Sequence, residues 1–225
     1  MKNFLEYLAA RPYPGRGLLI GLDPKGETAC AYFIMGRSEN SRNRVFEATE
    51  DGIRTRARDE ALMTDPSLII YHPVREMQDG TLIVTNGDQT DTLRDTLAAG
   101  GTVCSALATR EFEPDEPNFT PRVSGVLFPC GQSVLSILKT RDGKTCDRFY
   151  YSYETRPGYG QFISTYEGFG DPLPSWYGEP LTVEIPEGLD VKAWAEEIWN
   201  ALDENNRVSL WTRVGSDEYI INKPE

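Results

Sequence analysis

The alternation of apolar and polar residues along the first half of the chain predicts mainly strands. Segments rich in β-branched and aromatic residues, each bounded by Gly, Pro, Asp or Asn, lie at residues 17–23, 28–36, 44–50, 67–74 and 81–87. The last two are joined across Met77 to Gly80, where Asp-Gly is a strong hairpin signal. The charged run RTRARDEALM at residues 54–63 predicts one or two helical turns.

The second half repeats this strand pattern after a Pro-rich linker at residues 111–122. Gly- and Asp-rich turns separate strand candidates at residues 123–131, 133–141, 146–154 and 160–168. Their spacing predicts a meander, which we expect to form a second sheet. Two further strands are predicted at residues 208–214 and 218–223.

Helical spacing of apolar residues appears in only three places. Phe4, Leu5 and Leu8 predict a short helix before Pro12. Residues 92–110 have a helical pattern that Gly100-Gly101 must break or bend, and residues 191–204 form the clearest amphipathic helix. Strands with helices between and after them favour an α+β protein, most simply two packed sheets with helices outside.

Composition narrows the class of protein and of ligand. At 225 residues the chain fits one domain, residues 1–225, and its net charge of -12 argues against a nucleic-acid or anionic-membrane surface. A small phosphorylated ligand needs only a local cluster of positive charge. No stretch approaches the roughly 20 apolar residues of a membrane span, so we expect a cytoplasmic protein.

The cysteines and the single histidine do not suggest a metal site or a cofactor. Cys30, Cys104, Cys130 and Cys146 are far apart, and no CxxC pair occurs. We expect free, mostly buried thiols and no bound metal.

The loop NGDQTDT at residues 86–92 has more polar side chains than a turn and a helix N-cap require. It follows a predicted buried strand, where the first unpaired N–H groups of a helix can receive a phosphate, ribose or amide. A turn plus an N-cap, without a ligand, is the alternative. The candidate ligand-binding residues here are Asn86, Gly87, Asp88 and Thr90.

Arginines in apolar or tight-turn settings stand out in so acidic a chain. They are Arg16, Arg37, Arg42, Arg44 and Arg122. A guanidinium meets phosphate oxygens in bidentate fashion, but a single arginine is more often part of a surface ion pair. Only convergence would make these residues a binding site.

Two more positions carry candidate chemistry. In DEPNFTPR, at residues 115–122, Pro117 and Pro121 hold the backbone extended and fix the direction of Glu116 and Asn118. A solvated connector explains the same composition. Tyr71 ends a predicted strand, where its hydroxyl can donate to a developing anion.

Five motifs, taken in their order along residues 13 to 167, resemble those of the archaeal-type IMP cyclohydrolases. They are YPGRG, SRNR, NGDQTDT, DEPNFTPR and ISTYE. The resemblance implies a four-layer α-β-β-α sandwich like that of the N-terminal-nucleophile hydrolases, with residues 1–12 as an N-terminal extension. Because the chain opens Met1-Lys2-Asn3, we do not expect self-processing. The implied reaction is the dehydrating ring closure of 5-formamidoimidazole-4-carboxamide ribotide to IMP.

The resemblance also assigns roles as a hypothesis. Tyr71 and Glu116 would transfer protons and stabilise the oxyanion. The phosphate would be held, and the base oriented, by Arg16, Arg44 and Arg122. The remaining binding candidates are Arg37, Asn43, Asn86, Gly87, Asp88, Thr90 and Asn118.

Rival readings are a hydrolase of amide or cyclic C–N bonds and a non-catalytic purine-nucleotide-binding protein. The hydrolase would need a nucleophile such as Cys30 or Cys104, which we interpret as core residues from their apolar flanks. The partner we expect is a purine ribotide. The aromatic segments FYYSY and PSWYG suit a subunit interface or core packing equally, which leaves homo-oligomerisation open.

Overall fold

The computed structural model describes residues 3–63, 66 and 69–224, and within them the chain forms two antiparallel sheets. The six-stranded sheet has, in spatial order, β11 (Leu181–Glu184), β10 (Tyr159–Ser164), β1 (Arg16–Leu22), β2 (Thr28–Met35), β12 (Arg207–Val214) and β13 (Asp217–Asn222). The seven-stranded sheet has β3 (Arg44–Thr49), β4 (Gly52–Ala57), β5 (Val74–Glu76), β6 (Leu82–Thr85), β7 (Arg122–Leu127), β8 (Gln132–Lys139) and β9 (Asp147–Glu154).

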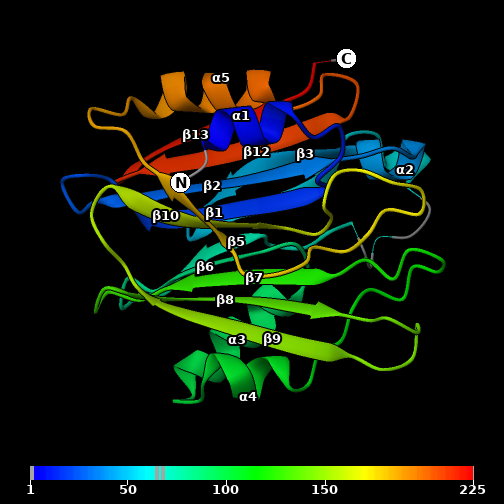
Figure 1. Ribbon diagram of the computed structural model, residues 1–225, viewed down its shortest axis with the longest axis horizontal. Coiled ribbons are helices and arrows are strands. Elements are labelled where there is room, and N and C mark those ends of the chain that lie inside the picture. Colours follow the sequence, from blue (N-terminus) through cyan, green and yellow to red (C-terminus); the bar gives the residue numbers. More distant parts are fainter. Residues whose placement is uncertain (1–2, 64–65, 67–68, 225) are drawn as a thin grey trace.

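Helices cover the outer face of each sheet, so the molecule has the layer order helix, sheet, sheet, helix (Figure 1). On the six-stranded sheet lie α1 (Phe4–Ala9) and α5 (Val191–Ala201), and on the seven-stranded sheet lie α3 (Gln89–Ala98) and α4 (Val103–Leu107). The short α2 (Glu39–Arg42) and the 3-10 turn η1 (Glu60–Leu62) lie in connections. No helix in the described residues is long and apolar enough to cross a membrane.

The main core lies between the two sheets. Strand β1 is buried on both faces, which explains its nearly continuous apolar sequence. Leu18 and Ile20 face the second sheet at Gly125 of β7, where a Cβ atom would lie 2.5 Å from the Ile20 side chain. Glycine at this position therefore lets the two sheets approach closely.

Most of the predicted elements are confirmed. The strands at 17–23, 28–36, 44–50 and 81–87 are β1, β2, β3 and β6, the meander at 123–154 is β7 to β9, and the last two strands are β12 and β13. The Asp-Gly hairpin joins β5 to β6. The predicted helices are α1, α5 and the pair α3 and α4, which Gly100-Gly101 separates.

Three predictions are wrong. The first is wrong only in part: the predicted helical turn within residues 54–63 is present as η1, but residues 54–57 belong to β4, because Ile53, Thr55 and Ala57 alternate inward with outward arginines. Residues 67–68 lie outside the described residues. Residues 69–73 are not a strand. They bond β4 at Thr55, whose hydroxyl contacts Ile69 and Tyr71 and whose N–H donates to the Tyr71 carbonyl oxygen at 2.8 Å, without forming a strand ladder.

The third error concerns the last strand of the meander. Strand β10 does not pair with β9 but crosses to the other sheet, where it lies between β1 and β11. The period-two pattern of a strand carries no information about the sheet that it joins.

Candidate functional site

A cavity of about 310 Å³ opens at one end of the interface between the sheets. Its walls come from the start of β1, the end of β2, the segment from Arg37 to Arg44 and the loop from Glu113 to Thr120. The lining side chains include Tyr13, Arg16, Arg37, Asn40, Ser41, Arg44, Glu113, Asp115, Asn118, Thr120 and Tyr166. The volume lies at the lower end of the range typical of small-molecule pockets.

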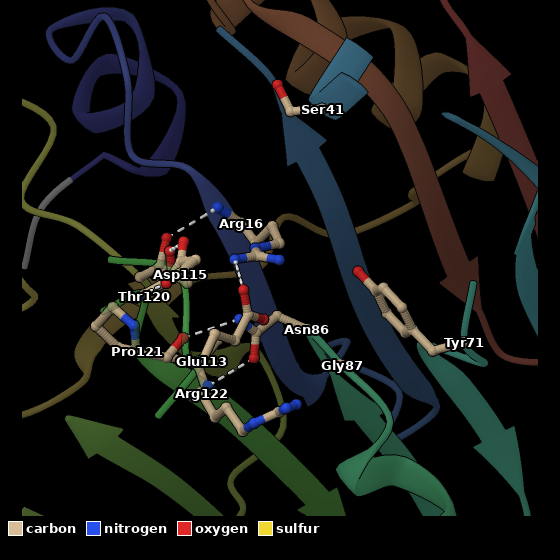
Figure 2. Close-up of polar contacts among 12 residues, drawn as sticks. Arg16, Ser41, Tyr71, Asn86, Gly87, Glu113, Asp115, Thr120, Pro121 and Arg122 are labelled. Carbon is tan, nitrogen blue, oxygen red and sulfur yellow. Dashed lines mark hydrogen bonds and ion pairs between the residues drawn. The ribbon is translucent and has the colours of Figure 1, made fainter. Parts of the chain in front are cut away.

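A buried ion pair lies on one wall of the cavity. The Arg16 guanidinium donates to Glu113 at 2.8 Å, and both side chains are at most a tenth exposed. Burial raises the pKa of Glu113, while the positive charges of Arg16 and Arg122 oppose that rise. Figure 2 shows the Arg16 guanidinium between Glu113 on one side and the ring of Tyr71 on the other. The pair therefore joins a fixed positive charge to a carboxyl group whose proton affinity is increased.

Tyr71 is buried close to this ion pair, although it does not line the cavity directly. Its hydroxyl lies 3.0 Å from the hydroxyl of Tyr32 on β2. Burial raises the pKa of Tyr32 well above its usual value, and the nearby Tyr71 adds to that rise. Tyr32 therefore remains a neutral phenol that orients the Tyr71 hydroxyl.

Arg44 lies at another wall with its charge uncompensated. The side chain is buried, and its Nε donates to the carbonyl oxygen of Ser41 at 3.0 Å. Among the described residues, no carboxylate pairs with it. Arg37 lines the same cavity and lies over the ring of Tyr13, with 4.7 Å from its guanidinium carbon to the ring centroid. A buried guanidinium without an anionic partner is costly, which makes this wall a natural place for an anionic ligand.

The loop from Glu113 to Thr120 is closed by its own hydrogen bonds. The Glu113 N–H donates to the Thr120 carbonyl oxygen at 2.8 Å, and Asp115 accepts from both the backbone N–H and the hydroxyl of Thr120. The Thr120 hydroxyl also lies 2.7 Å from the hydroxyl of Tyr166. These bonds fix the direction in which Glu113 and Asp115 enter the cavity.

Of the predicted site residues, the structure brings Arg16, Arg37, Arg44 and Asn118 to the cavity. Glu116 belongs to the same loop as Asn118, but it is exposed and does not line the cavity. The carboxyl groups of this loop that line the cavity are Glu113 and Asp115, and of these Glu113 is paired with Arg16. The burial of Glu113 could not be recognised from the acidic run in which it lies.

The other predicted binding residues do not line the cavity, and protein partners occupy their polar groups. The Asn43 side chain pairs with the backbone of Asp59 in both directions. In the segment after β6, the polar groups of Asn86, Asp88 and Thr90 bond within the protein, and Gly87 contributes backbone only. Arg122, the first residue of β7, donates to Asp88 and Gln89.

Several lining residues were missed from the sequence, namely Tyr13, Ser38, Asn40, Ser41, Glu113, Asp115 and Tyr166. Tyr13 and Tyr166 lie inside or beside the motifs YPGRG and ISTYE, and their rings stack at 6.2 Å. Their positions within these motifs could have identified both tyrosines as site residues. Ser41 likewise begins the motif SRNR, whereas nothing local distinguishes Ser38 and Asn40 from residues of an exposed turn.

The prediction of mostly buried cysteines is wrong. Cys30 is buried, but Cys104 and Cys130 are exposed and Cys146 is half-buried. Cys104 is therefore not a core residue, since it lies on the outer side of the short helix α4. Neither Cys30 nor Cys104 lines the cavity. Burial also raises the pKa of Cys30 to about 12, which disfavours its thiolate.

Comparisons with known proteins agree on one family. A family model described as IMP cyclohydrolase-like protein matches residues 13–219. The chain is also 30% identical over 145 residues to a protein named IMP cyclohydrolase from Methanopyrus kandleri, an alignment that covers 59% of this chain and 71% of that relative.

Proposed function

The chain belongs to the IMP cyclohydrolase-like family, and from this membership we propose how its cavity carries out the IMP cyclohydrolase reaction. In that reaction the carboxamide nitrogen of 5-formamidoimidazole-4-carboxamide ribotide attacks the formyl carbon, and water leaves to give IMP. The observation that carries the proposal is the pairing, in one cavity, of the uncompensated Arg44 with the buried Arg16–Glu113 pair. The wall with Arg44 suits the phosphate, and the wall with Arg16 and Glu113 suits the formyl and carboxamide groups.

The 5′-phosphate binds at Arg44 and Arg37 in this proposal. Arg44 is preorganised by its bond to Ser41, and the free guanidinium edge needs an anion. Arg37 is exposed at the rim, where its position over Tyr13 leaves its N–H groups free for phosphate oxygens. Arg122 takes no part in phosphate binding here, because Asp88 and Gln89 already accept from its Nη1.

The ring closure requires positioning more than covalent catalysis, because nucleophile and electrophile belong to one molecule. Arg16 stabilises the negative charge that develops on the formyl oxygen, and the Tyr71 hydroxyl donates to the same region. Glu113 accepts a proton from the attacking carboxamide nitrogen and gives it to the formyl oxygen, which becomes a hydroxyl. It then accepts the proton of the former formamido nitrogen and gives it to that hydroxyl, so that water leaves as the ring C=N bond forms. Its raised pKa suits both steps.

This proposal moves the proton-transfer role from Glu116 to Glu113. The test compares Glu113→Gln with Glu116→Gln, which removes one negative charge from the same loop. We expect Glu113→Gln to lower kcat by about 10²- to 10⁴-fold, the usual contribution of a general acid or base. Glu116→Gln should stay within about twofold of the unmodified protein. The reverse pattern, measured by IMP formation with both proteins folded, would return the role to Glu116.

We also propose that the chain has the fold of the N-terminal-nucleophile hydrolases, without their self-processing. The support is the stacking of two antiparallel sheets between helices (Figure 1). The family model begins to match at residue 13, which supports the interpretation of residues 1–12 as an addition to a single domain.

Two earlier alternatives have less support. A hydrolase with a cysteine nucleophile would need a thiol in the cavity, and among the described residues none lines it. A pure binding protein would not need the proton-accepting Glu113 beside Arg16. Association of copies through FYYSY and PSWYG stays a prediction, to which the 85% exposure of Tyr177 lends support.

A further inference from the structure

Strand β9 is the one long sheet edge that the described residues leave open (Figure 1). At the edge strand β3, the Asn222 side chain accepts from the Phe46 N–H at 2.8 Å and donates to the Phe46 carbonyl oxygen at 3.0 Å, which joins β3 to the edge strand β13. The fourth edge, β11, has only four residues. Strand β9 has eight, pairs with β8 without a bulge and contains no Pro, Gly or Lys, so it lacks the usual protection of an edge.

The ladder to β8 shows which backbone groups of β9 face the open side. The Thr155 N–H donates to the Gly131 carbonyl oxygen at 2.8 Å, and this pair continues the register in which Gln132 lies opposite Glu154. Because bonded pairs alternate along an antiparallel ladder, the odd-numbered residues of β9 bond β8. The outward N–H and C=O groups are those of Arg148, Tyr150, Ser152 and Glu154. Among the described residues, no group bonds them.

Two charges on β9 also lack an ionic partner in the described part of the chain. Arg148 donates to carbonyl oxygens beside α4, among them that of Arg110 at 2.7 Å, but to no carboxylate. Glu154 is exposed and forms no ion pair. Both side chains belong to the same face of the strand, but at roughly 3.4 Å per residue about 20 Å separates them. They therefore cannot pair within one chain.

We propose that β9 pairs with β9 of a second copy, antiparallel about a two-fold axis at Tyr151. The outward groups allow only pairings in which even-numbered residues occupy the bonded positions. The pairing centred at Tyr151 sets Arg148 opposite Glu154 of the second copy, and the symmetry repeats this ion pair. A centre at Tyr150 or Ser152 would separate these two charges. Charge complementarity thus selects both the partner and the register.

The aromatic side chains of β9 fit the same register. Phe149 lies opposite Tyr153 of the second copy, and Tyr151 lies opposite its own symmetry mate, pairs that stabilise antiparallel sheets. Phe149 and Tyr151 also line a cavity of about 640 Å³ together with Tyr177, which is 85% exposed. Tyr153 of the second copy would extend this aromatic wall.

The charge and the size of the surface set the expected strength of pairing. The net charge of -12 opposes association of two copies, but Lys139 in the cavity wall and Arg148 both lack a carboxylate partner among the described residues. This rim is therefore less acidic than the chain as a whole. Since one strand is much smaller than the roughly 20–30 residues of a standard interface, we expect a dissociation constant in the micromolar range.

Sedimentation of the full chain over a range of concentrations tests the pairing, and it needs no ribotide, so its outcome is independent of the proposed function. Ser152→Pro removes one outward N–H and leaves the ladder to β8 intact, because proline is tolerated on an edge strand whose N–H faces solvent. We expect it to weaken dimerisation at least about tenfold. Ser152→Ala keeps the N–H and is the matched control. Equal dissociation constants in these two folded variants, or an unmodified chain that stays monomeric up to about 1 mM, would overturn the proposal.

Glu154→Lys tests the ion pairs and keeps the proposal testable if Ser152→Pro does not fold. It places like charges opposite each other at both ends of the paired strands, so we expect dimerisation about tenfold weaker. Glu187→Lys makes the same charge change at an exposed loop position, and it should not weaken association. Dissociation constants that agree between these two variants contradict the pairing of Arg148 with Glu154.

Disulfide cross-linking tests the register. Opposed Cα atoms at a non-bonded antiparallel position lie about 4.5 Å apart, which is within the range that a disulfide spans. Mild oxidation should therefore cross-link copies of Tyr151→Cys. Ser152→Cys should not exceed the background of the unmodified protein, in which Cys104 and Cys130 are exposed. Cross-linking of Ser152→Cys in preference to Tyr151→Cys, or of neither above background, would overturn the pairing centred at Tyr151.

Discussion

The segment from Arg37 to Arg44 and the loop from Asn86 to Asp91 both present polar side chains next to a strand end, but they use them differently. In the loop, the amide groups of Asn86 and Gln89 bond the backbone on either side of Arg122, and the Thr90 hydroxyl bonds the Gly87 carbonyl oxygen within the loop. In the segment, the buried Arg44 has no carboxylate partner and Asn40 Oδ1 is buried without a hydrogen bond, among the residues that the structure describes. A ligand site is therefore recognised by polar groups that lack partners, and not by their number.

The largest difference should appear when the charge of Arg44 is removed. Arg44→Met deletes a contact between buried charges in the ligand complex, which typically costs about 2–5 kcal/mol and so raises KM by roughly 30-fold or more. The free protein should lose no stability, since a buried unpaired charge is removed. Steady-state kinetics and thermal unfolding would check both expectations. Arg42→Met, an exposed neighbour, is the control, and a KM change as large there would contradict the assignment.

In the loop the effect should fall on stability. Asn86→Ala leaves the Pro121 carbonyl oxygen and the Val123 N–H without their side-chain partner in a buried place. We expect the free energy of unfolding to fall by about 2–3 kcal/mol, because each unsatisfied buried group is costly. Urea denaturation would measure it. A loss below about 0.5 kcal/mol would mean that solvent or other groups replace these bonds.

A smaller effect should depend on pH through Asp88. Partial burial opposes its ionisation, but the hydrogen bond from Arg110 and the charge of Arg122 lower its pKa below 3.8. A lowered carboxyl pKa stabilises the fold above the unfolded value, and this stabilisation is lost as pH falls through the folded value. Asp88→Asn should therefore reduce stability at pH 7 by less than about 1 kcal/mol, given its exposure. The difference from the unmodified protein should shrink as pH falls through the lowered pKa of Asp88, and a difference that does not change with pH would contradict an electrostatic origin.

The smallest effect on stability should come from Asn40. Asn40→Ala removes an acceptor that has no partner, so the unfolding free energy should change by no more than about 0.5 kcal/mol in either direction. The ribotide should nevertheless bind more weakly, since Asn40 lines the cavity. Calorimetric titration with IMP would separate the two effects, and unchanged affinity would remove Asn40 from the binding site.

Local patterns predicted most of the strands and helices but not the pairing between them. Strand β10 has the same alternation as β9, yet it lies beside β1 because the long-range core around Leu18 and Phe162 determines its sheet. The arginines of the cavity were recognised because positive charge is unusual in an acidic chain. Glu113 was not, since neighbouring acids hide a carboxyl group whose partner, Arg16, is 97 residues away.

The polar loop shows the same limit. NGDQTDT was interpreted as a surface that reads a ligand because its side chains exceed the needs of a turn. The partners of Asn86, Asp88 and Gln89 are at residues 121–123, more than 30 residues away, so no local rule identifies them. The sequence thus locates unusual polar groups, but tertiary contacts decide whether these groups bond the protein itself or are left for a ligand.

Helix α1 has a practical consequence for anyone who shortens the chain. Residues 3–12 precede the stretch matched by the family model, yet Phe4 and Leu8 are buried and the ring of Phe4 lies 5.1 Å from that of Phe162. A chain trimmed to begin at Tyr13 would present Phe162 and its apolar neighbours to water. Such a protein would keep every residue of the cavity and still be prone to aggregate, so solubility, rather than turnover, would be the first property to suffer.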